Sequence, residues 1–201
     1  MKLKVILSSV RDGRQGEKVA RWVMDELASD TQFESELLDL KNYQFPYFED
    51  ALPSSQLHMP YEPKLRQQWA EKIAEADAFL IITPEYNHSY PAVLKSALDV
   101  IYHEWNNKPV SFISYGGSAN GSRAVEHLRL VAIELQMAAI REGIHIGLFS
   151  GEQIFNESGE MVAKSNNHKL ERLLSSLFWW ADALRMARLK KIESVNPKVA
   201  S

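Results

Sequence analysis

The sequence predicts an α/β domain in which a parallel sheet is covered by helices on both faces. Three observations lead to this fold class. Strand-like and helix-like segments alternate along the chain, the strand-like runs are short and apolar, and 201 residues are enough for one sizeable core. Alternation of this kind produces right-handed crossovers between parallel strands. With 45% hydrophobic residues and a net charge of −3, an intrinsically disordered chain is excluded.

Five apolar runs have the length of strands. The predicted strands lie within residues 4–7, 33–40, 78–82, 110–114 and 140–149. The run 78–82 contains no polar residue, as expected of a strand that is buried on both faces.

Apolar residues at helical spacing lie between these runs. Predicted helices cover residues 19–27, 64–75, 91–103, 124–135 and 170–184. Pro91 suits a first helical turn, where an amide needs no partner. The element count matches a flavodoxin-like three-layer fold with strand order 2-1-3-4-5, although periodicity alone does not determine the order. We expect one domain over residues 1–189 and a loose, charged tail over 190–201.

Two aromatic segments have no clear role in this scheme. Residues 43–61 are rich in proline and aromatic side chains, and three roles are open for them: covering a site, packing on a partner subunit, or forming a packed surface loop. Trp179 and Trp180 in the last helix are interpreted as core and interface residues rather than cofactor contacts.

Composition excludes several classes of function. The chain has no cysteine, so disulfides, thiolate metal sites and a cysteine nucleophile are excluded. No apolar run reaches the roughly 18 residues of a membrane span, and the chain starts directly with a short strand rather than a signal peptide. The isoelectric point of about 6.1 disfavours nucleic-acid binding. We expect a cytoplasmic protein without nucleic-acid or membrane partners.

Ligands of open parallel sheets bind beyond the carboxyl ends of the strands, so the loops there are the candidate sites. Residues 8–17 follow the first strand and lead into a helix N-terminus, which attracts anions. Ser9 can donate a hydrogen bond, Arg11 can hold two phosphate oxygens, and Gly16 permits a close backbone approach. The alternative interpretation is a polar surface turn with solvated arginines.

The loops after the third and fourth strands complete the candidate site. In residues 83–91, two prolines stiffen the backbone and two tyrosines offer aromatic surface for a planar ligand; the alternative is a stiff turn. His88 has no metal-ligand spacing around it, and no metal site is predicted. In residues 114–123, clustered glycines leave amides free to face a ligand, unless this is a flexible loop capped by Ser122. A phosphorylated planar cofactor fits the three loops together, and flavin mononucleotide (FMN) fits best.

These loops resemble those of the NAD(P)H-dependent FMN reductase family, which has a flavodoxin-like fold. The resemblance covers roughly residues 3–140. Its motifs are Ser9-x-Arg11-x-x-Arg14-x-Gly16, then residues 84–91 with Leu94-Lys95 and Asp99, then residues 114–117 with Arg123-Ala124 and Leu128-Arg129. Two positions depart from the family pattern: Ser8 stands where many relatives have glycine, and Asn120-Gly121 stands where many have a Gly-Gly pair.

The resemblance implies non-covalent FMN and a homodimer or homotetramer. It implies a ping-pong reaction, with hydride passing from NADPH or NADH to FMN and then to a free flavin, quinone, azo compound or metal oxyanion. The flavin N5 carries the hydride, so no side chain is expected to be catalytic, and Glu85 is expected to make a structural contact. The implied cofactor contacts are Ser9, Arg11, Arg14, Gly16, Glu17, Pro84, Glu85, Tyr86, Asn87, Ser114, Tyr115, Gly116 and Gly117.

Two other functions stay open at this point. One is a flavodoxin-type electron carrier that binds FMN without oxidising NAD(P)H. Such carriers are usually strongly acidic, which a net charge of −3 does not match. The other is an interaction protein without flavin on the same fold, since fold does not determine function. The three ligand-suited loops argue against it.

Overall fold

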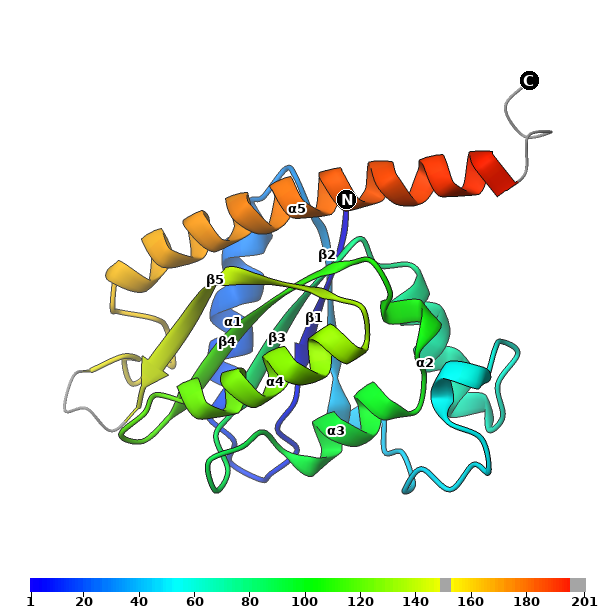
Figure 1. The fold of residues 1–201 in the computed structure, drawn as a ribbon. Coiled ribbons are helices and arrows are strands. Elements are labelled where there is room, and N and C mark those ends of the chain that lie inside the picture. The colour runs from blue at the N-terminus through cyan, green and yellow to red at the C-terminus, as the bar shows by residue number, and fades with distance from the viewer. Residues whose placement is uncertain (149–152, 196–201) are drawn as a thin grey trace.

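A computed structural model describes residues 1–148 and 153–195. Its five strands are parallel and form one sheet in the order β2-β1-β3-β4-β5, which confirms the predicted flavodoxin-like topology (Figure 1). The strands are β1 (Lys2–Leu7), β2 (Glu34–Asp39), β3 (Ala78–Pro84), β4 (Pro109–Gly116) and β5 (Ala138–Gly147). The central strand β3 is buried along its whole length, as its apolar sequence predicts.

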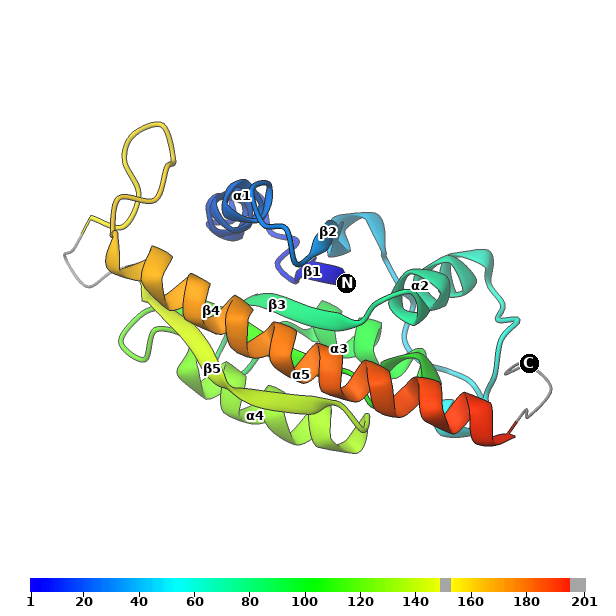
Figure 2. The same cartoon turned by 90° about the horizontal axis from the view of Figure 1, so that it is seen from above.

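Helices cover both faces of the sheet (Figure 2). Two helices pack on one face, α1 (Gly16–Leu27) and α5 (Ser165–Val195). Three pack on the other, α2 (Lys64–Ala74), α3 (Ala92–Asp99) and α4 (Ser122–Glu134). Three short 3₁₀ turns complete the described elements, η1 (Leu40–Asn42), η2 (Ser54–Gln56) and η3 (His103–Trp105).

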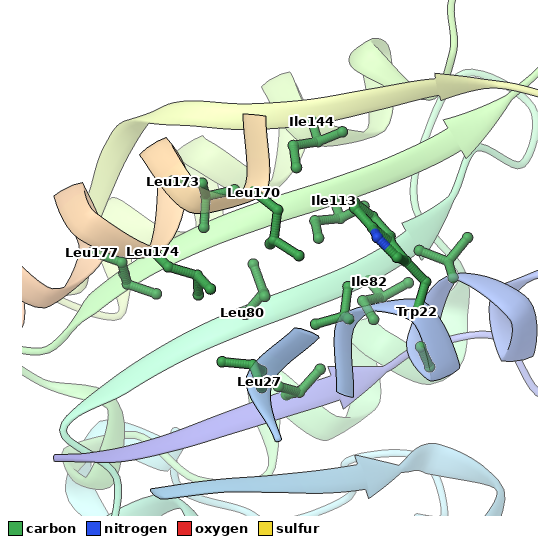
Figure 3. Packing of buried hydrophobic residues seen from close by; sticks show 14 of the residues in the cluster. Trp22, Leu27, Leu80, Ile82, Ile113, Ile144, Leu170, Leu173, Leu174 and Leu177 are labelled. Carbon is green, nitrogen blue, oxygen red and sulfur yellow. The ribbon is translucent and has the colours of Figure 1, made fainter. Parts of the chain in front are cut away.

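Alternation along the strands divides the core into two layers. On β3, Leu80 and Ile82 face α1 and α5, whereas Phe79 and Ile81 face the other three helices. Trp22 of α1 lies over the first layer near Ile82 and Ile113, and the leucines of α5 cover another part of the same layer (Figure 3). Burial of each such side chain stabilises the fold by roughly 1.5–3 kcal/mol.

The start of α1 is held in place by this packing. Val19, Trp22 and Val23 recur at helical spacing and are buried, which orients α1 along the sheet. The Trp22 indole donates a 3.0 Å hydrogen bond to the Asn167 side chain and so joins α1 to α5. The first turn of α1 therefore has a fixed position at the carboxyl edge of the sheet.

The end of the chain corrects two expectations. Helix α5 continues to Val195, beyond the predicted boundary at residue 189. Before that boundary, Arg188 donates a 2.7 Å hydrogen bond to the Asn107 carbonyl. Residues 196–201 lie outside the described residues. Trp179 and Trp180 are 65% and 38% exposed, so they are not core residues.

Residues 43–61 run along the surface and pack on the fold mainly at their two ends. The rings of Tyr43 and Phe45 lie 4.9 and 5.8 Å from the Trp69 ring. The Tyr61 hydroxyl donates a 3.0 Å hydrogen bond to Glu104. Between these ends most side chains are exposed, including Tyr47 at 86%.

Among the described residues, no helix is both long and apolar enough to cross a bilayer.

Candidate functional site

A cleft of about 330 Å³ lies where the carboxyl ends of β1, β3 and β4 meet. Most of the residues predicted from the sequence line it. The lining consists of Ser9, Arg11, Asp12, Gly13, Arg14, Gln15, Pro84, Glu85, Tyr86, Tyr115, Gly116, Gly117 and Leu148. The topology thus brings the three predicted loops together at one edge of the sheet.

The loop after β1 (residues 8–16, the β1 loop) offers free backbone donors to the cleft. The amides of Arg11, Asp12 and Gly13 donate to no acceptor in the described chain. Gly13 has φ +64°, in the left-handed region that glycine adopts without strain, and this turns the loop back toward α1. Successive free amides beside a helix N-terminus form an anion-binding surface.

Arg11 adds an unpaired positive charge to this surface. It is exposed and forms no ion pair with any described residue. Its guanidinium carbon lies 5.7 Å from the centre of the Tyr86 ring, within the range of a cation–π contact. Arg11 can therefore reach an anion in the cleft without breaking an ion pair.

Arg14 also borders the cleft, but its guanidinium already has partners. The side chain is 3% exposed and forms an ion pair with Asp39, the last residue of β2. Nη1 and Nη2 donate to the two Asp39 oxygens, Nη1 also to the Ser9 carbonyl, and Nε at 3.0 Å to Glu17. Arg14 thus connects the β1 loop to the end of β2 and to the first turn of α1.

The loop after β3 forms a tight hairpin (residues 86–89, the β3 hairpin). The Tyr86 amide donates to the Ser89 carbonyl at 2.7 Å, and the Ser89 amide donates back at 3.0 Å. Asn87 and His88 between them both have positive φ, the geometry of a type I′ turn. Tyr86 lies at the cleft, with its hydroxyl 2.8 Å from the Ser9 hydroxyl, whereas the exposed Asn87 does not line the cleft.

Glu85 makes a structural contact, as predicted, and the contact lies within the chain. Its side chain is 6% exposed and accepts a 2.6 Å hydrogen bond from Nε of Arg123 in the first turn of α4. The Glu85 amide donates to the Tyr115 carbonyl at 3.1 Å. Glu85 therefore ties the ends of β3 and β4 to α4.

The loop after β4 (residues 117–121, the β4 loop) borders the cleft with Gly117. Asn120 and Gly121 have φ +54° and +83°, so asparagine supports the left-handed turn at the position where relatives have glycine. A Cβ on Gly121 would lie 2.8 Å from the Tyr115 amide, which excludes a side chain there. Ser114 lies behind this loop: its hydroxyl is 3.0 Å from the Asn120 carbonyl and 2.7 Å from Nδ1 of His145.

Gly16 and Tyr115 pack closely beneath the β1 loop. A Cβ on Gly16 would lie 2.5 Å from the Tyr115 hydroxyl and 2.8 Å from Leu7, so only glycine fits. Burial raises the pKa of Tyr115 and keeps its hydroxyl neutral. Gly16 and Glu17 begin α1 directly under the free amides, but neither lines the cleft.

Two residues at this edge were not identified from the sequence. Leu148, just after β5, lines the cleft and lies outside the three loops predicted from the sequence. Asp39 holds Arg14 from the end of β2. Only the strand order could have indicated Asp39, because it depends on β2 lying beside β1 with Asp39 opposite Leu7.

The described residues contain no cluster of three or more His, Asp or Glu side chains suited to a metal ion. The groups that converge on the cleft are amides, one free guanidinium, glycine backbone and a tyrosine ring. They suit a ligand with an anionic end and a planar end. Fold and site together define a flavodoxin-like protein with a cleft for a phosphorylated, planar cofactor.

Comparison with known proteins identifies the family. The family model described as NADPH-dependent FMN reductase matches residues 1–149, about three quarters of the chain. The chain belongs to this family. NAD(P)H-dependent FMN reductase C4B3.06c of Schizosaccharomyces pombe is 40% identical over 137 residues, which cover 68% of each chain. NADPH:quinone oxidoreductase of Arabidopsis thaliana is 34% identical over 119 residues, 57% of this chain and 61% of the plant protein.

A solved structure supports the fold. FerB, a flavoenzyme NAD(P)H:(acceptor) oxidoreductase from Paracoccus denitrificans, aligns with a TM-score of 0.73. The alignment covers 90% of this chain and 97% of FerB at 21% identity. The similarity in fold therefore extends beyond the 149 residues of the family match.

Proposed function

We propose that this protein is an NAD(P)H-dependent FMN reductase that passes hydride from NADPH or NADH through bound FMN to a diffusible acceptor. The acceptor classes are free flavin, quinone, azo compound and metal oxyanion. The observation that carries the proposal is the cleft, where free amides and the unpaired Arg11 meet the Tyr86 ring and the β4 loop. Family membership supports the same reaction class.

The donor set of the cleft fits FMN in two parts. The phosphate requires N–H donors and positive charge, and the β1 loop offers both. The ring requires a flat wall and close backbone, which Tyr86 and the β4 loop offer. Gly16 belongs to the same fit, because a side chain there would displace Tyr115 from beneath the phosphate end.

At the phosphate end, the chain binds and neutralises charge. Arg11 would hold the phosphate with its guanidinium N–H groups, and the amides of Arg11, Asp12 and Gly13 would supply further donors. Ser9 adds a hydroxyl that is shared with Tyr86. The Glu17 amide lies in the first turn of α1, where the helix dipole favours an anion.

At the ring end, residues of the chain would position the flavin ring and polarise it. When bound, FMN supplies the chemistry of accepting a hydride and giving it up again. Pro84 to Tyr86 form the wall beside the ring, and the rigid β3 hairpin keeps that wall in place. Gly116 and Gly117 line the cleft, and free backbone amides there would favour negative charge at the polar edge of the ring. Gly117 is exposed, so this end of the cleft is open to a second small molecule.

The test uses the purified full-length protein. We expect flavin absorption that co-purifies or is restored by FMN, and anaerobic loss of that absorption on addition of NADPH or NADH. Re-oxidation by each acceptor class, followed in stopped flow, then ranks the acceptors. FMN uptake without bleaching by either nucleotide would indicate an electron carrier instead. Failure to take up FMN would refute any flavoprotein function.

The proposal includes a homodimer or homotetramer in the cytoplasm. Exposed apolar side chains on α4 and α5, Leu130 and Ile133 at 69% and 68% and Trp179, offer surface for subunit contacts. Light scattering after size exclusion measures the subunit number. A monomer at micromolar concentration would contradict this part of the proposal.

A further inference from the structure

The β1 loop is held from outside the cleft by a residue that contacts no ligand there. We propose that Asp39 is a positioning residue for the phosphate of FMN, acting through Arg14. The inference rests on the proposed function and deepens it, because it names the group that gives the cleft its preference for a phosphorylated flavin.

The geometry is that of a two-step clamp. Asp39 ends the edge strand β2 and lies opposite Leu7, the residue at which β1 passes into the β1 loop. Both of its oxygens accept from the two terminal nitrogens of Arg14, the fork arrangement that fixes a guanidinium in position and angle. Nη1 of Arg14 also donates to the Ser9 carbonyl, so Arg14 joins both ends of the segment 9–14.

The clamp holds the segment that carries the free amides of the β1 loop. The Ser9 carbonyl is occupied by Arg14 from below, and the amides of Arg11, Asp12 and Gly13 lie in the segment that the clamp spans. Without it, the loop ends would be joined only by the chain itself. A phosphate must be met by several donors at once, and each misplaced donor lowers its affinity.

The charges of the clamp compensate one another. Burial alone raises the pKa of Asp39, but hydrogen bonds from Arg14 and the Lys41 amide lower it overall, so Asp39 is ionised at neutral pH. Arg14 is neutralised by Asp39 and Glu17. Arg11 is therefore left as the unpaired cation that the cleft offers among its described residues. Asp39 directs Arg14 to a structural role and leaves phosphate binding to Arg11 and the amides.

The experiment compares FMN with riboflavin, which has the same ring but no phosphate. Dissociation constants of both flavins are measured by fluorescence quenching on the full-length protein and on Asp39→Asn. The substitution keeps the shape of the side chain and its acceptor for the Lys41 amide, but it removes the charge and one oxygen of the fork. We expect the FMN dissociation constant to rise about tenfold, with riboflavin affected less than about twofold.

Two further variants keep the test decisive. Asp50→Asn is the matched control, because Asp50 also pairs with a buried arginine, Arg66, but lies in the surface loop away from the cleft. In this variant, the ratio of the FMN dissociation constant to the riboflavin dissociation constant should be the same as in wild type. Asp39→Glu keeps the charge and displaces the fork, so it should raise the ratio of the FMN to the riboflavin dissociation constant by a smaller factor. It replaces Asp39→Asn if that variant does not fold.

The outcomes separate the two claims. A wild-type ratio in Asp39→Asn or, if that variant does not fold, in Asp39→Glu, even with reduced thermal stability, would make Asp39 a structural residue only and overturn the inference. Equal losses for FMN and riboflavin would overturn it too, because a phosphate-positioning role does not weaken the ring contacts. If the wild-type protein takes up neither flavin, the proposed function itself fails and the inference fails with it.

Discussion

The two ends of the sheet use charged residues in opposite ways. At the amino end, buried charges are paired within the protein: Lys4 with Glu36 and Glu75, and Arg188 with Asp77. At the carboxyl end, Arg14 is paired in the same manner, but Arg11 and three neighbouring amides have no partner in the described chain. A hollow of about 430 Å³ at the amino end is larger than the cleft, yet its Lys108 donates to two carbonyls of α2 and its Arg188 to Asp77.

The difference shows that volume does not identify the site. Charges at the amino end connect helices to strands, so a ligand there would have to break existing bonds. Donors at the carboxyl end are already oriented and unused, so a ligand gains their full interaction without that cost. The cleft therefore differs from the hollow because hydrogen-bond donors without a partner lie next to a donor, Arg14, that is paired within the protein.

Removing one arginine from each end of the sheet gives the largest expected effects on FMN affinity and on stability. Arg11→Ala should raise the FMN dissociation constant about 100-fold, since it removes a charge-assisted fork, and change stability by less than about 0.5 kcal/mol. Arg188→Ala should do the reverse, with stability reduced by about 1–2 kcal/mol and FMN affinity unchanged, because Arg188 bonds Asp77 and Asn107 far from the cleft. Flavin titration and urea unfolding measure both. Full FMN affinity in Arg11→Ala would remove the distinction between the two ends.

The packing under the cleft gives the next effect. Gly16→Ala places a Cβ 2.5 Å from the buried Tyr115 hydroxyl, so we expect a loss of about 2 kcal/mol in the free energy of unfolding. Gly117→Ala is the control, since a Cβ there meets no atom within 4 Å, and its stability should match wild type. Equal stability of the two variants would show that the floor of the cleft is not tightly packed.

The pH dependence of stability tests the role of Lys108 at the amino end of the sheet. Burial, with Arg188 nearby, lowers its pKa to about 7, against about 10.4 in an unfolded chain. Between these values the unfolded chain binds the extra proton, so stability rises with pH. From pH 7 to 9, wild type should therefore gain about 2 kcal/mol relative to Lys108→Met, measured by urea unfolding. A constant difference between the two proteins would mean that the two carbonyl hydrogen bonds keep Lys108 charged.

Ser8 gives the smallest effect. Its hydroxyl is fully buried and has no hydrogen-bond partner in the described part of the chain. Ser8→Ala should raise the free energy of unfolding by about 0.5 kcal/mol, because an unsatisfied polar group is removed. A loss of FMN affinity in this variant would instead give the hydroxyl a role at the cleft.

The sequence predicted the helices and strands better than the side-chain contacts between them. Apolar runs and helical spacing identify all five strands and the five helices, because burial of each element leaves its own period in the sequence. The role of Arg14 was beyond this reasoning. Its partner Asp39 is 25 residues away, and their contact depends on strand order and register. The same holds for Ser114, which lies behind the β4 loop against His145 of β5.

The link between Asp39 and the β1 loop joins the rim of the sheet to the place where a flavin phosphate is expected. An edge strand has a neighbour on one side only and opens more readily than a central strand. When β2 frays, Arg14 loses its anchor and the loop is released in the same event. A bound flavin should in turn slow amide hydrogen exchange along β2, although no residue of that strand touches the cleft.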